Sequence, residues 1–189
     1  MTREEFIRKF YPATIEATKG SGIFPEVAIS QAIVESADRR GVPYKSSLAV
    51  KYNNFFGIKA DRSWKGRAVR LQTDEYFDPK VKTTIVDGFR VYDSYKDSVA
   101  DYVKFLKENA RYRNAGVFSA KTPDEQIEAI KRAGYATAPS YAQTIKSIIK
   151  ANLDTMMDVA KKYQSYAPYV LVMGLLGIYL GYRYYKLKK

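Results

Sequence analysis

The sequence predicts a mostly helical α+β domain with a small antiparallel β region, followed by an apolar C-terminal segment. Apolar residues recur at helical spacing in most of the first 153 residues. Between residues 64 and 92 the pattern changes to alternating apolar and polar positions, which is typical of short antiparallel strands. Residues 163–182 then carry no charged side chain. We therefore expect one folded domain over 1–153, a linker or helix extension over 154–165, and a separate segment after it.

The composition restricts the chemistry of the chain. It has no Cys and no His, which excludes disulfides, thiol nucleophiles, the common zinc sites and His-based triads. Acid–base chemistry must then come from Asp, Glu, Tyr or Lys, and we expect no metal and no cofactor. The formal net charge of +12 favours a polyanionic partner. Lys and Arg are spread evenly and no nucleic-acid-binding pattern is found, so nucleic acid is not the expected partner.

Capping signals define the starts of three expected helices. Thr2 and Glu5 form a capping box for the first, which runs to about Thr18. Pro25 lies in the first turn of the second helix, where its missing N–H costs nothing. Thr122 is the expected N-cap of a later helix, with a proline directly after it.

The helix after Pro25 carries one carboxylate, Glu35, on an otherwise apolar or neutral surface. Glu35 shares a helical stripe with Gln31 and two alanines, none of which can pair with it as a cation. Desolvation on such a face raises the pKa of a carboxyl group, which suits a general acid near neutral pH. The alternative is a helix-border Glu that pairs with Arg39 at i+4. Gly41 is expected to stop this helix.

Residues 64–92 are expected to form two or three short strands. Turns are predicted near Asp78-Pro79 and Asp87-Gly88, because Asp, Pro and Gly favour turn conformations. Glu75 lies in this region, on a strand end or in a loop.

The C-terminal segment has the length of a membrane span. About 20 uncharged residues at ~1.5 Å each cover ~30 Å, the thickness of a bilayer's hydrocarbon core. We expect a transmembrane helix over 166–185 and a basic tail over 186–189. Gly177 and Gly181 form a small-xxx-small pair that favours self-association. The alternative is a buried core helix.

The orientation of this span stays open. The basic tail favours a cytoplasmic C-terminus and an external domain. However, the first residues, Met1–Phe6, contain no apolar stretch of a signal peptide, so export of the domain would need help. The alternative is a tail anchor with the N-terminus inside, which must move four basic residues across the membrane.

Three motifs occur in order along the chain: Gln31-Ala32-x-x-Glu35-Ser36, Asn54-x-Phe56-Gly57-Ile58-Lys59 and Gly134-Tyr135-Ala136-Thr137. With this order and spacing, the chain from about residue 5 to 153 resembles the glucosaminidase domain of glycoside hydrolase family 73. This family contains the peptidoglycan N-acetylglucosaminidases of bacteria and phages.

The resemblance implies a lysozyme-like α+β fold, in which a helical lobe faces a small β lobe across a sugar-binding groove. It also implies hydrolysis of the β-1,4 bond between N-acetylglucosamine and N-acetylmuramic acid in peptidoglycan. Glu35 matches the catalytic acid of the family, Glu75 its second carboxylate, and Tyr135 the tyrosine near the cleavage site.

The same resemblance supplies candidates for substrate binding. Asn54, Phe56 and Gly57 match the groove-lining motif, and Trp64 and Tyr141 are two further candidates. Phe56 and Trp64 either stack on sugar rings or close the core.

Two mechanisms stay open from the sequence. Glu75 could activate a water molecule and invert the anomeric centre, if the two carboxyl groups lie ~6.5–9.5 Å apart. Otherwise the 2-acetamido group of the substrate attacks, and Tyr135 orients or stabilises it. One departure from the family pattern is Ala138, which stands where the family often has Asp. Another is the segment 38–45, which replaces the family's more usual turn.

The leading hypothesis is thus a membrane-anchored hydrolase that faces the cell wall and acts on peptidoglycan glycan strands. One rival is a non-catalytic wall-binding or phage structural module with the same fold. Another is the same fold acting on the other glycan bond, as a muramidase or a lytic transglycosylase does.

Overall fold

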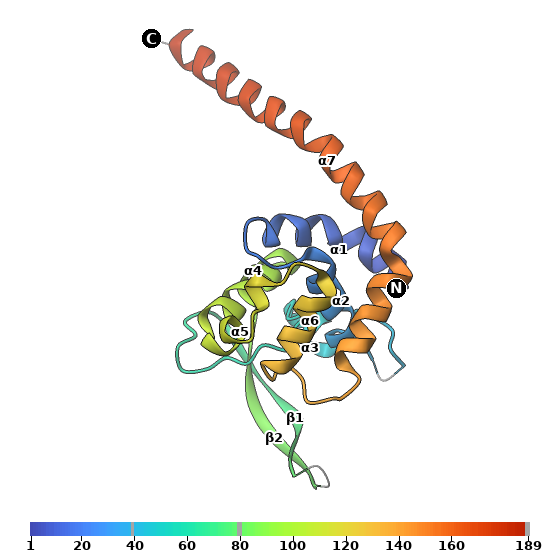
Figure 1. The fold of residues 1–189 in the computed structure, drawn as a ribbon. Coiled ribbons are helices and arrows are strands. Elements are labelled where there is room, and N and C mark those ends of the chain that lie inside the picture. The colour runs from blue at the N-terminus through green and yellow to red at the C-terminus, as the bar shows by residue number, and fades with distance from the viewer. Residues whose placement is uncertain (39, 79–80, 188–189) are drawn as a thin grey trace.

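Helices form most of the fold, and a two-stranded hairpin projects from one end of them (Figure 1). The computed structural model describes the backbone of residues 1–38, 40–78 and 81–187, and the side chains of 1–38, 40–72 and 85–164. The elements are α1 (Arg3–Thr18), α2 (Pro25–Glu35), α3 (Ser47–Tyr52), β1 (Ala68–Asp78), β2 (Val81–Arg90), α4 (Tyr95–Glu108), α5 (Ala110–Asn114), the 3-10 helix η1 (Val117–Ser119), α6 (Pro123–Arg132) and α7 (Tyr141–Leu187). This arrangement is the expected mostly helical, lysozyme-like α+β class.

The predicted helix starts are confirmed. The Glu5 N–H donates to the Thr2 hydroxyl, and the Thr2 N–H donates to the Glu5 carboxylate, which completes the capping box of α1. Pro25 occupies the first turn of α2, and Thr122 caps α6 through the Glu125 N–H.

Helix α2 ends earlier than predicted, at Glu35 instead of near Gly41. The chain turns back immediately, because the Ser36 carbonyl accepts hydrogen bonds from the N–H groups of Lys45 and Ser46. The Ser36 hydroxyl also accepts one from the Tyr44 N–H. Glu35 is therefore the last residue of a buried helix instead of a residue within a longer one.

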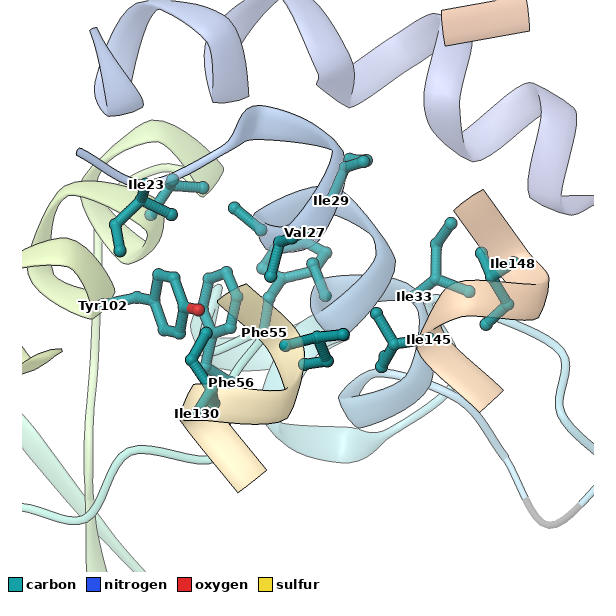
Figure 2. Packing of buried hydrophobic residues seen from close by; sticks show 14 of the residues in the cluster. Ile23, Val27, Ile29, Ile33, Phe55, Phe56, Tyr102, Ile130, Ile145 and Ile148 are labelled. Carbon is teal, nitrogen blue, oxygen red and sulfur yellow. The ribbon is translucent and has the colours of Figure 1, made fainter. Parts of the chain in front are cut away.

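The core surrounds α2, whose residues from Val27 to Ile33 are all buried. Ile33 lies beside Ile145 and Ile148 of α7, and Val27 lies among side chains of the central cluster (Figure 2). Each such aliphatic side chain stabilises the fold by about 1.5–3 kcal/mol when it is fully buried. The core therefore holds α2, and with it Glu35, in one position.

The hairpin pairs β1 with β2 in antiparallel register, from Ala68 opposite Arg90 to Asp78 opposite Val81. The turn predicted at Asp87-Gly88 is wrong, because both residues lie within β2. A primed hairpin turn needs positive φ at glycine, and Gly88 is not among the positive-φ glycines. Instead, the Gly88 carbonyl accepts a hydrogen bond from the Ala60 N–H, which joins the hairpin to the preceding loop.

Helix α7 continues past Leu153, where the sequence placed the end of the globular part. Met156 and Val159 are buried in the common core, and Arg8 of α1 pairs with Asp158 at 2.9 Å. Residues 154–160 therefore pack as part of the domain, because their apolar face meets α1.

The predicted span over 166–185, the basic tail over 186–189 and the pair Gly177/Gly181 lie outside the residues whose side chains are described. Within the described part of the chain, no helix combines the length and the apolar character that a membrane crossing requires.

Candidate active site

Glu35 is half-buried and lines an open cleft of about 600 Å³ between helices and the loop after α3. Its described lining residues come from α2, the segment after α3, α4, α5 and the segment after α6. They are Glu35, Phe56, Gly57, Ile58, Lys59, Asp61, Phe105, Arg111, Tyr112, Tyr135 and Ala136. The fold therefore brings Glu35, Phe56, Gly57 and Tyr135 together, as the motifs predicted.

The environment of Glu35 favours its protonated form. Burial raises the pKa of the carboxyl group, and a hydrogen bond from the Tyr141 hydroxyl to Oε1 at 2.8 Å partly opposes this. The direction agrees with the expectation from the helical stripe. Arg39, the alternative partner, lies outside the described residues. Among those described, Tyr141 is the hydrogen-bond partner of the Glu35 side chain.

Tyr135 lines the same cleft as Glu35. Gly134, with φ +79°, ends α6 in a conformation that a residue with a Cβ rarely adopts, and the chain then turns into Tyr135. The Tyr135 hydroxyl is buried and has no hydrogen-bond partner among the described residues. Burial, and next the charge of Glu35, hold the pKa of Tyr135 well above its usual value, so the hydroxyl stays protonated. Its proton is therefore not committed to any described acceptor.

The loop after α3 forms one wall of the cleft. Gly57 has φ +64°, which favours glycine at this position. The Phe56 ring stacks on Tyr102 with centroids 4.2 Å apart, and it also lines the cleft. Asn54 does not line the cleft: its amide donates to the carbonyls of Ile58 and Arg90, both at 2.9 Å. Asn54 therefore stabilises the conformation of the loop through backbone hydrogen bonds.

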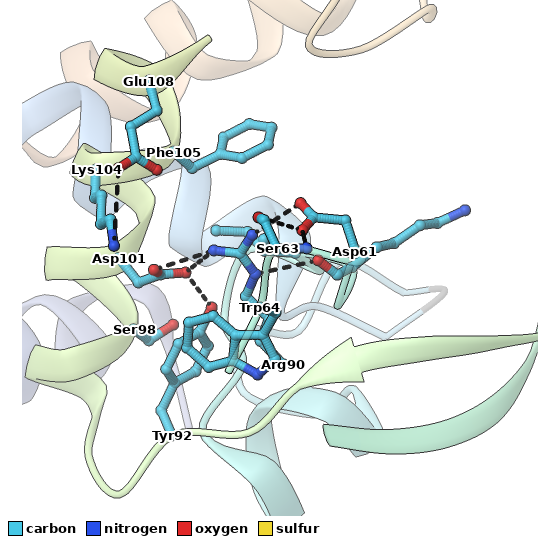
Figure 3. Close-up of polar contacts among 12 residues, drawn as sticks. Asp61, Ser63, Trp64, Arg90, Tyr92, Ser98, Asp101, Lys104, Phe105 and Glu108 are labelled. Atoms are coloured by element: carbon cyan, nitrogen blue, oxygen red, sulfur yellow. Dashed lines mark hydrogen bonds and ion pairs between the residues drawn. The ribbon is translucent and has the colours of Figure 1, made fainter. Parts of the chain in front are cut away.

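Tyr141 and Trp64, two predicted substrate-binding residues, also lie outside the described lining of the cleft. Tyr141 is buried behind Glu35 and bonds to it. The Trp64 ring packs against the Arg90 guanidinium, whose Cζ lies 4.6 Å from the ring centroid (Figure 3). Both residues support the walls of the site instead of forming its surface.

Arg90 connects the hairpin to α4. Its side chain is only 7% exposed and pairs with Asp101 at 2.8 Å and with Asp61 at 3.2 Å (Figure 3). The Tyr92 hydroxyl donates a further hydrogen bond to Asp101 at 2.7 Å. This cluster holds Asp61 at the cleft. The pKa of Asp61 is shifted in the opposite direction to that of Glu35. Hydrogen bonds from Ser63, first of all from its hydroxyl, hold the pKa of the Asp61 carboxyl below its usual value.

Glu75, the predicted second carboxylate, lies on β1 with its backbone opposite Thr83. Its side chain lies outside the described residues, so its catalytic role stays a prediction. Asp61 is the second carboxylate that lines the cleft in the described part of the chain. No three His, Cys, Asp or Glu side chains within that part are grouped as a metal site requires.

Outside the quoted motifs, sequence reasoning missed four described residues of the cleft: Asp61, Phe105, Arg111 and Tyr112. None belongs to the motifs quoted above. Phe105 and Tyr112 carry helical apolar spacing, which signals a core position equally well. Asp61 and Arg111 carry only their charge. The fold brings these residues together from three segments. Asp61 comes from the loop after α3, Phe105 from α4, and Arg111 and Tyr112 from α5.

A helical domain with a small antiparallel hairpin and a half-buried acid in the cleft defines a lysozyme-like glycosidase fold. The family model described as "Glucosaminidase: Mannosyl-glycoprotein endo-beta-N-acetylglucosaminidase" matches residues 11–154. The chain belongs to this glucosaminidase family of glycoside hydrolases.

Individual relatives agree with this assignment. The peptidoglycan hydrolase FlgJ of Vibrio parahaemolyticus is 38% identical over 154 residues, which cover 81% of this chain and 48% of FlgJ. The glycoside hydrolase domain of Salmonella typhimurium FlgJ is 31% identical with a TM-score of 0.63, covering 87% of this chain and 97% of that one. The catalytic domain of the autolysin Auto from Listeria monocytogenes is 27% identical with a TM-score of 0.68, covering 82% and 86%. The chain spans about half the length of the curated relatives it matches.

Proposed function

We propose that this chain hydrolyses the β-1,4 bond between N-acetylglucosamine and N-acetylmuramic acid in peptidoglycan. The observation that carries the proposal is the half-buried Glu35 carboxyl in the cleft, with its pKa raised by burial. Relatives named peptidoglycan hydrolases at 33–38% identity support the substrate class. The net charge of +12 is also suited to a wall that carries peptide carboxylates and anionic polymers.

In the proposed mechanism, Glu35 is protonated and donates its proton to the oxygen of the scissile glycosidic bond. The bond breaks as positive charge develops at the anomeric carbon, and the leaving sugar departs as an alcohol. Asp61 lines the same cleft, and its lowered pKa favours the ionised form, so it contributes a negative charge there. Carboxyl groups whose environments move their pKa values in opposite directions are a common feature of glycosidase sites.

The nucleophile of the reaction is either a water molecule activated by Glu75 or the 2-acetamido group of the substrate. Tyr135 lines the cleft and its hydroxyl has no hydrogen-bond partner among the described residues, which supports a role for Tyr135 in orienting this nucleophile. The anomer of the freshly released product separates the two routes. Inversion, seen by NMR within the first turnovers, supports Glu75 and water, whereas retention supports attack by the acetamido group.

Product analysis tests the proposal directly. The full chain is incubated with purified peptidoglycan, new reducing ends are reduced with borohydride, and the fragments are identified by mass spectrometry, with Glu35→Gln as the control. Reduced N-acetylglucosamine ends support the proposal. Reduced N-acetylmuramic acid identifies a muramidase, and 1,6-anhydromuramic ends identify a lytic transglycosylase. Glycan that is bound but uncut identifies a wall-binding module.

We further propose that residues 166–185 anchor the chain in a membrane with the domain facing the wall. The absence of charged residues over 163–182 and the unbroken helical backbone to Leu187 support this. Gly177 and Gly181 are the proposed contact for self-association. The chain and a version ending at Gln164, which keeps Met156 and Val159, are compared by vesicle flotation, and protease protection reads the orientation. Equal flotation of the two contradicts the anchor.

A further inference from the structure

A chain of three hydrogen bonds, two of them buried and the last part-buried, ends at Glu35. The Tyr102 hydroxyl of α4 donates to Gln31 Oε1 of α2. Gln31 Nε2 donates to the Tyr141 hydroxyl oxygen of α7 at 2.9 Å, and Tyr141 donates to Glu35 Oε1 at 2.8 Å. Tyr102, Gln31 and Tyr141 are all buried, and none of them lines the cleft. This chain therefore contacts the acid without contacting a substrate.

The amide of Gln31 gives the chain one direction. An amide donates only from its nitrogen and accepts only at its oxygen. Because Gln31 Nε2 donates to the Tyr141 oxygen, the single proton of Tyr141 cannot point toward Gln31, and it points to Glu35 instead. The Tyr102 proton at Gln31 Oε1 holds the amide in this orientation. Burial, followed by the nearby Glu35 charge, holds the pKa of Tyr141 well above its usual value, so Tyr141 remains a donor.

The direction of the chain decides which oxygen of Glu35 carries the acidic proton. Oε1 accepts the hydrogen bond from Tyr141, so a proton on the neutral acid resides on Oε2. No described side chain forms a hydrogen bond to Oε2, and Glu35 lines the cleft. The proton is thus on the oxygen to which no described side chain is hydrogen-bonded.

We propose that Gln31 is a positioning residue for catalysis: by fixing the direction of the Tyr141 hydroxyl, it keeps the acidic proton of Glu35 on the oxygen that is available to the cleft. This inference rests on the proposed role of Glu35 as the acid. It assigns a functional reason to an amide that is buried in a helix where an apolar residue would pack without needing partners.

Other titratable or charged groups surround the acid. They are the hydroxyls of Tyr102, Tyr112 and Tyr135 and the cleft side chains of Lys59, Asp61 and Arg111. All of them are retained when Gln31 or Tyr141 is replaced. A change in the pH profile of such variants therefore reflects the loss of the hydrogen bonds from Tyr102 through Gln31 and Tyr141 to Glu35.

The test compares wild type with Gln31→Met, Tyr141→Phe and the double variant in the full chain. We measure kcat and kcat/KM on peptidoglycan against pH, and titrate Glu35 by carboxyl ¹³C NMR with Glu35→Gln for assignment. Tyr141→Phe removes a hydrogen-bond donor to the Glu35 carboxylate, which raises the pKa of Glu35. The basic limb of the pH–activity profile therefore moves to higher pH, and kcat falls about 10- to 100-fold. Gln31→Met shifts the limb in the same direction with a smaller loss, about tenfold. It adds nothing when Tyr141 is already Phe, because Gln31 acts through Tyr141.

Gln126 of α6 provides a matched control. It is also fully buried, and its amide bonds to backbone groups of Gly22, Phe24 and Val117, away from Glu35. Gln126→Met is expected to lower stability and leave the basic limb unchanged. Should Gln31→Met not fold, Gln31→Met combined with Tyr102→Phe removes both partners of one bond, which is the less costly change.

Two outcomes overturn the inference: a wild-type pH profile in Gln31→Met, or losses in the two single variants that add fully in the double variant. The NMR titration reads Glu35 whether or not the chain cleaves glycan. A wild-type chain without hydrolase activity therefore contradicts the proposed function, while an unshifted Glu35 titration in Gln31→Met contradicts the positioning role.

Discussion

The two walls of the cleft hold their carboxylates in opposite ways. On the helical wall, Glu35 is half-buried at the end of α2 and accepts one hydrogen bond, so burial dominates and raises its pKa. On the wall formed by the loop after α3, which Arg90 of β2 holds and which we call the hairpin wall, the Asp61 side chain is 57% exposed. It accepts several hydrogen bonds, so its pKa is lowered. One cleft thus contains a carboxyl group whose pKa is raised and another whose pKa is lowered. The difference comes from solvent access and hydrogen-bond donors, since the two groups are chemically alike.

The walls also differ in what supports them. Glu35 is held by apolar packing around α2 and by a single direct donor, Tyr141. Asp61 is held by Arg90, which is buried together with Asp101. The helical wall therefore depends on the core, and the hairpin wall depends on a buried ion pair. The following predictions separate these two dependences, from the largest expected effect to the smallest.

Replacing the acid itself has the largest effect. Glu35→Gln is expected to lower turnover of peptidoglycan by about 10²–10⁴-fold, because a general acid contributes this much. The measurement is the initial rate of release of reducing ends, with circular dichroism to check the fold. Activity within threefold of wild type places the acid elsewhere.

Breaking the buried pair of the hairpin wall is the largest expected change in stability. Arg90→Met leaves the Asp101 carboxylate, only 10% exposed, without its cation, and we expect a loss of about 3–5 kcal/mol in the free energy of unfolding. Urea unfolding measures it. Lys104→Gln removes the exposed pair Lys104–Glu108 on the same helix and serves as the control, with a change below about 0.5 kcal/mol. Equal losses in the two variants contradict a special role for burial.

The raised pKa of Glu35 predicts that the acid costs stability when it is ionised. The folded state holds this proton more tightly than the unfolded state, so stability falls as pH rises from the unfolded pKa through the folded one. Glu35→Gln cannot ionise and is therefore expected to melt higher than wild type at pH 8, by about 2–4 °C for ~1 kcal/mol. The difference should vanish at pH 4. Calorimetry at the two pH values checks this. An equal rise in melting temperature at both pH values contradicts the link between Glu35 ionisation and stability.

Replacing the exposed carboxylate of the hairpin wall has the smallest expected effect. Asp61→Asn removes an exposed partner of Arg90 while Asp101 remains, so the free energy of unfolding should change by less than about 1 kcal/mol. The basic limb of the pH profile should also stay in place, since Glu35 determines it. A shifted limb would instead mean that Asp61 and Glu35 titrate as a coupled pair.

Local signals in the sequence predicted much of the fold. The capping box at Thr2, the proline at position 25 and the cap at Thr122 depend only on neighbours within four residues, and the structure has all three helix starts. The neutral stripe around Glu35 predicted the direction of its pKa for the same reason. The end of α2 was missed, because Ser36 bonds to residues nine and ten positions further along.

The sequence by itself determined the helical class, the family motifs and the choice of Glu35 as the candidate acid, because each depends on residues that are close together in the chain. Only the tertiary structure decided which residues bond to Glu35 and which second carboxylate shares its cleft. Tyr141 reaches Glu35 from 106 positions away, Tyr102 reaches Gln31 from 71, and Arg90 brings Asp61 to the cleft from 29. Such partners leave no periodic or spacing signal, because a hydrogen bond across a core depends on how helices pack and not on the order of neighbouring residues.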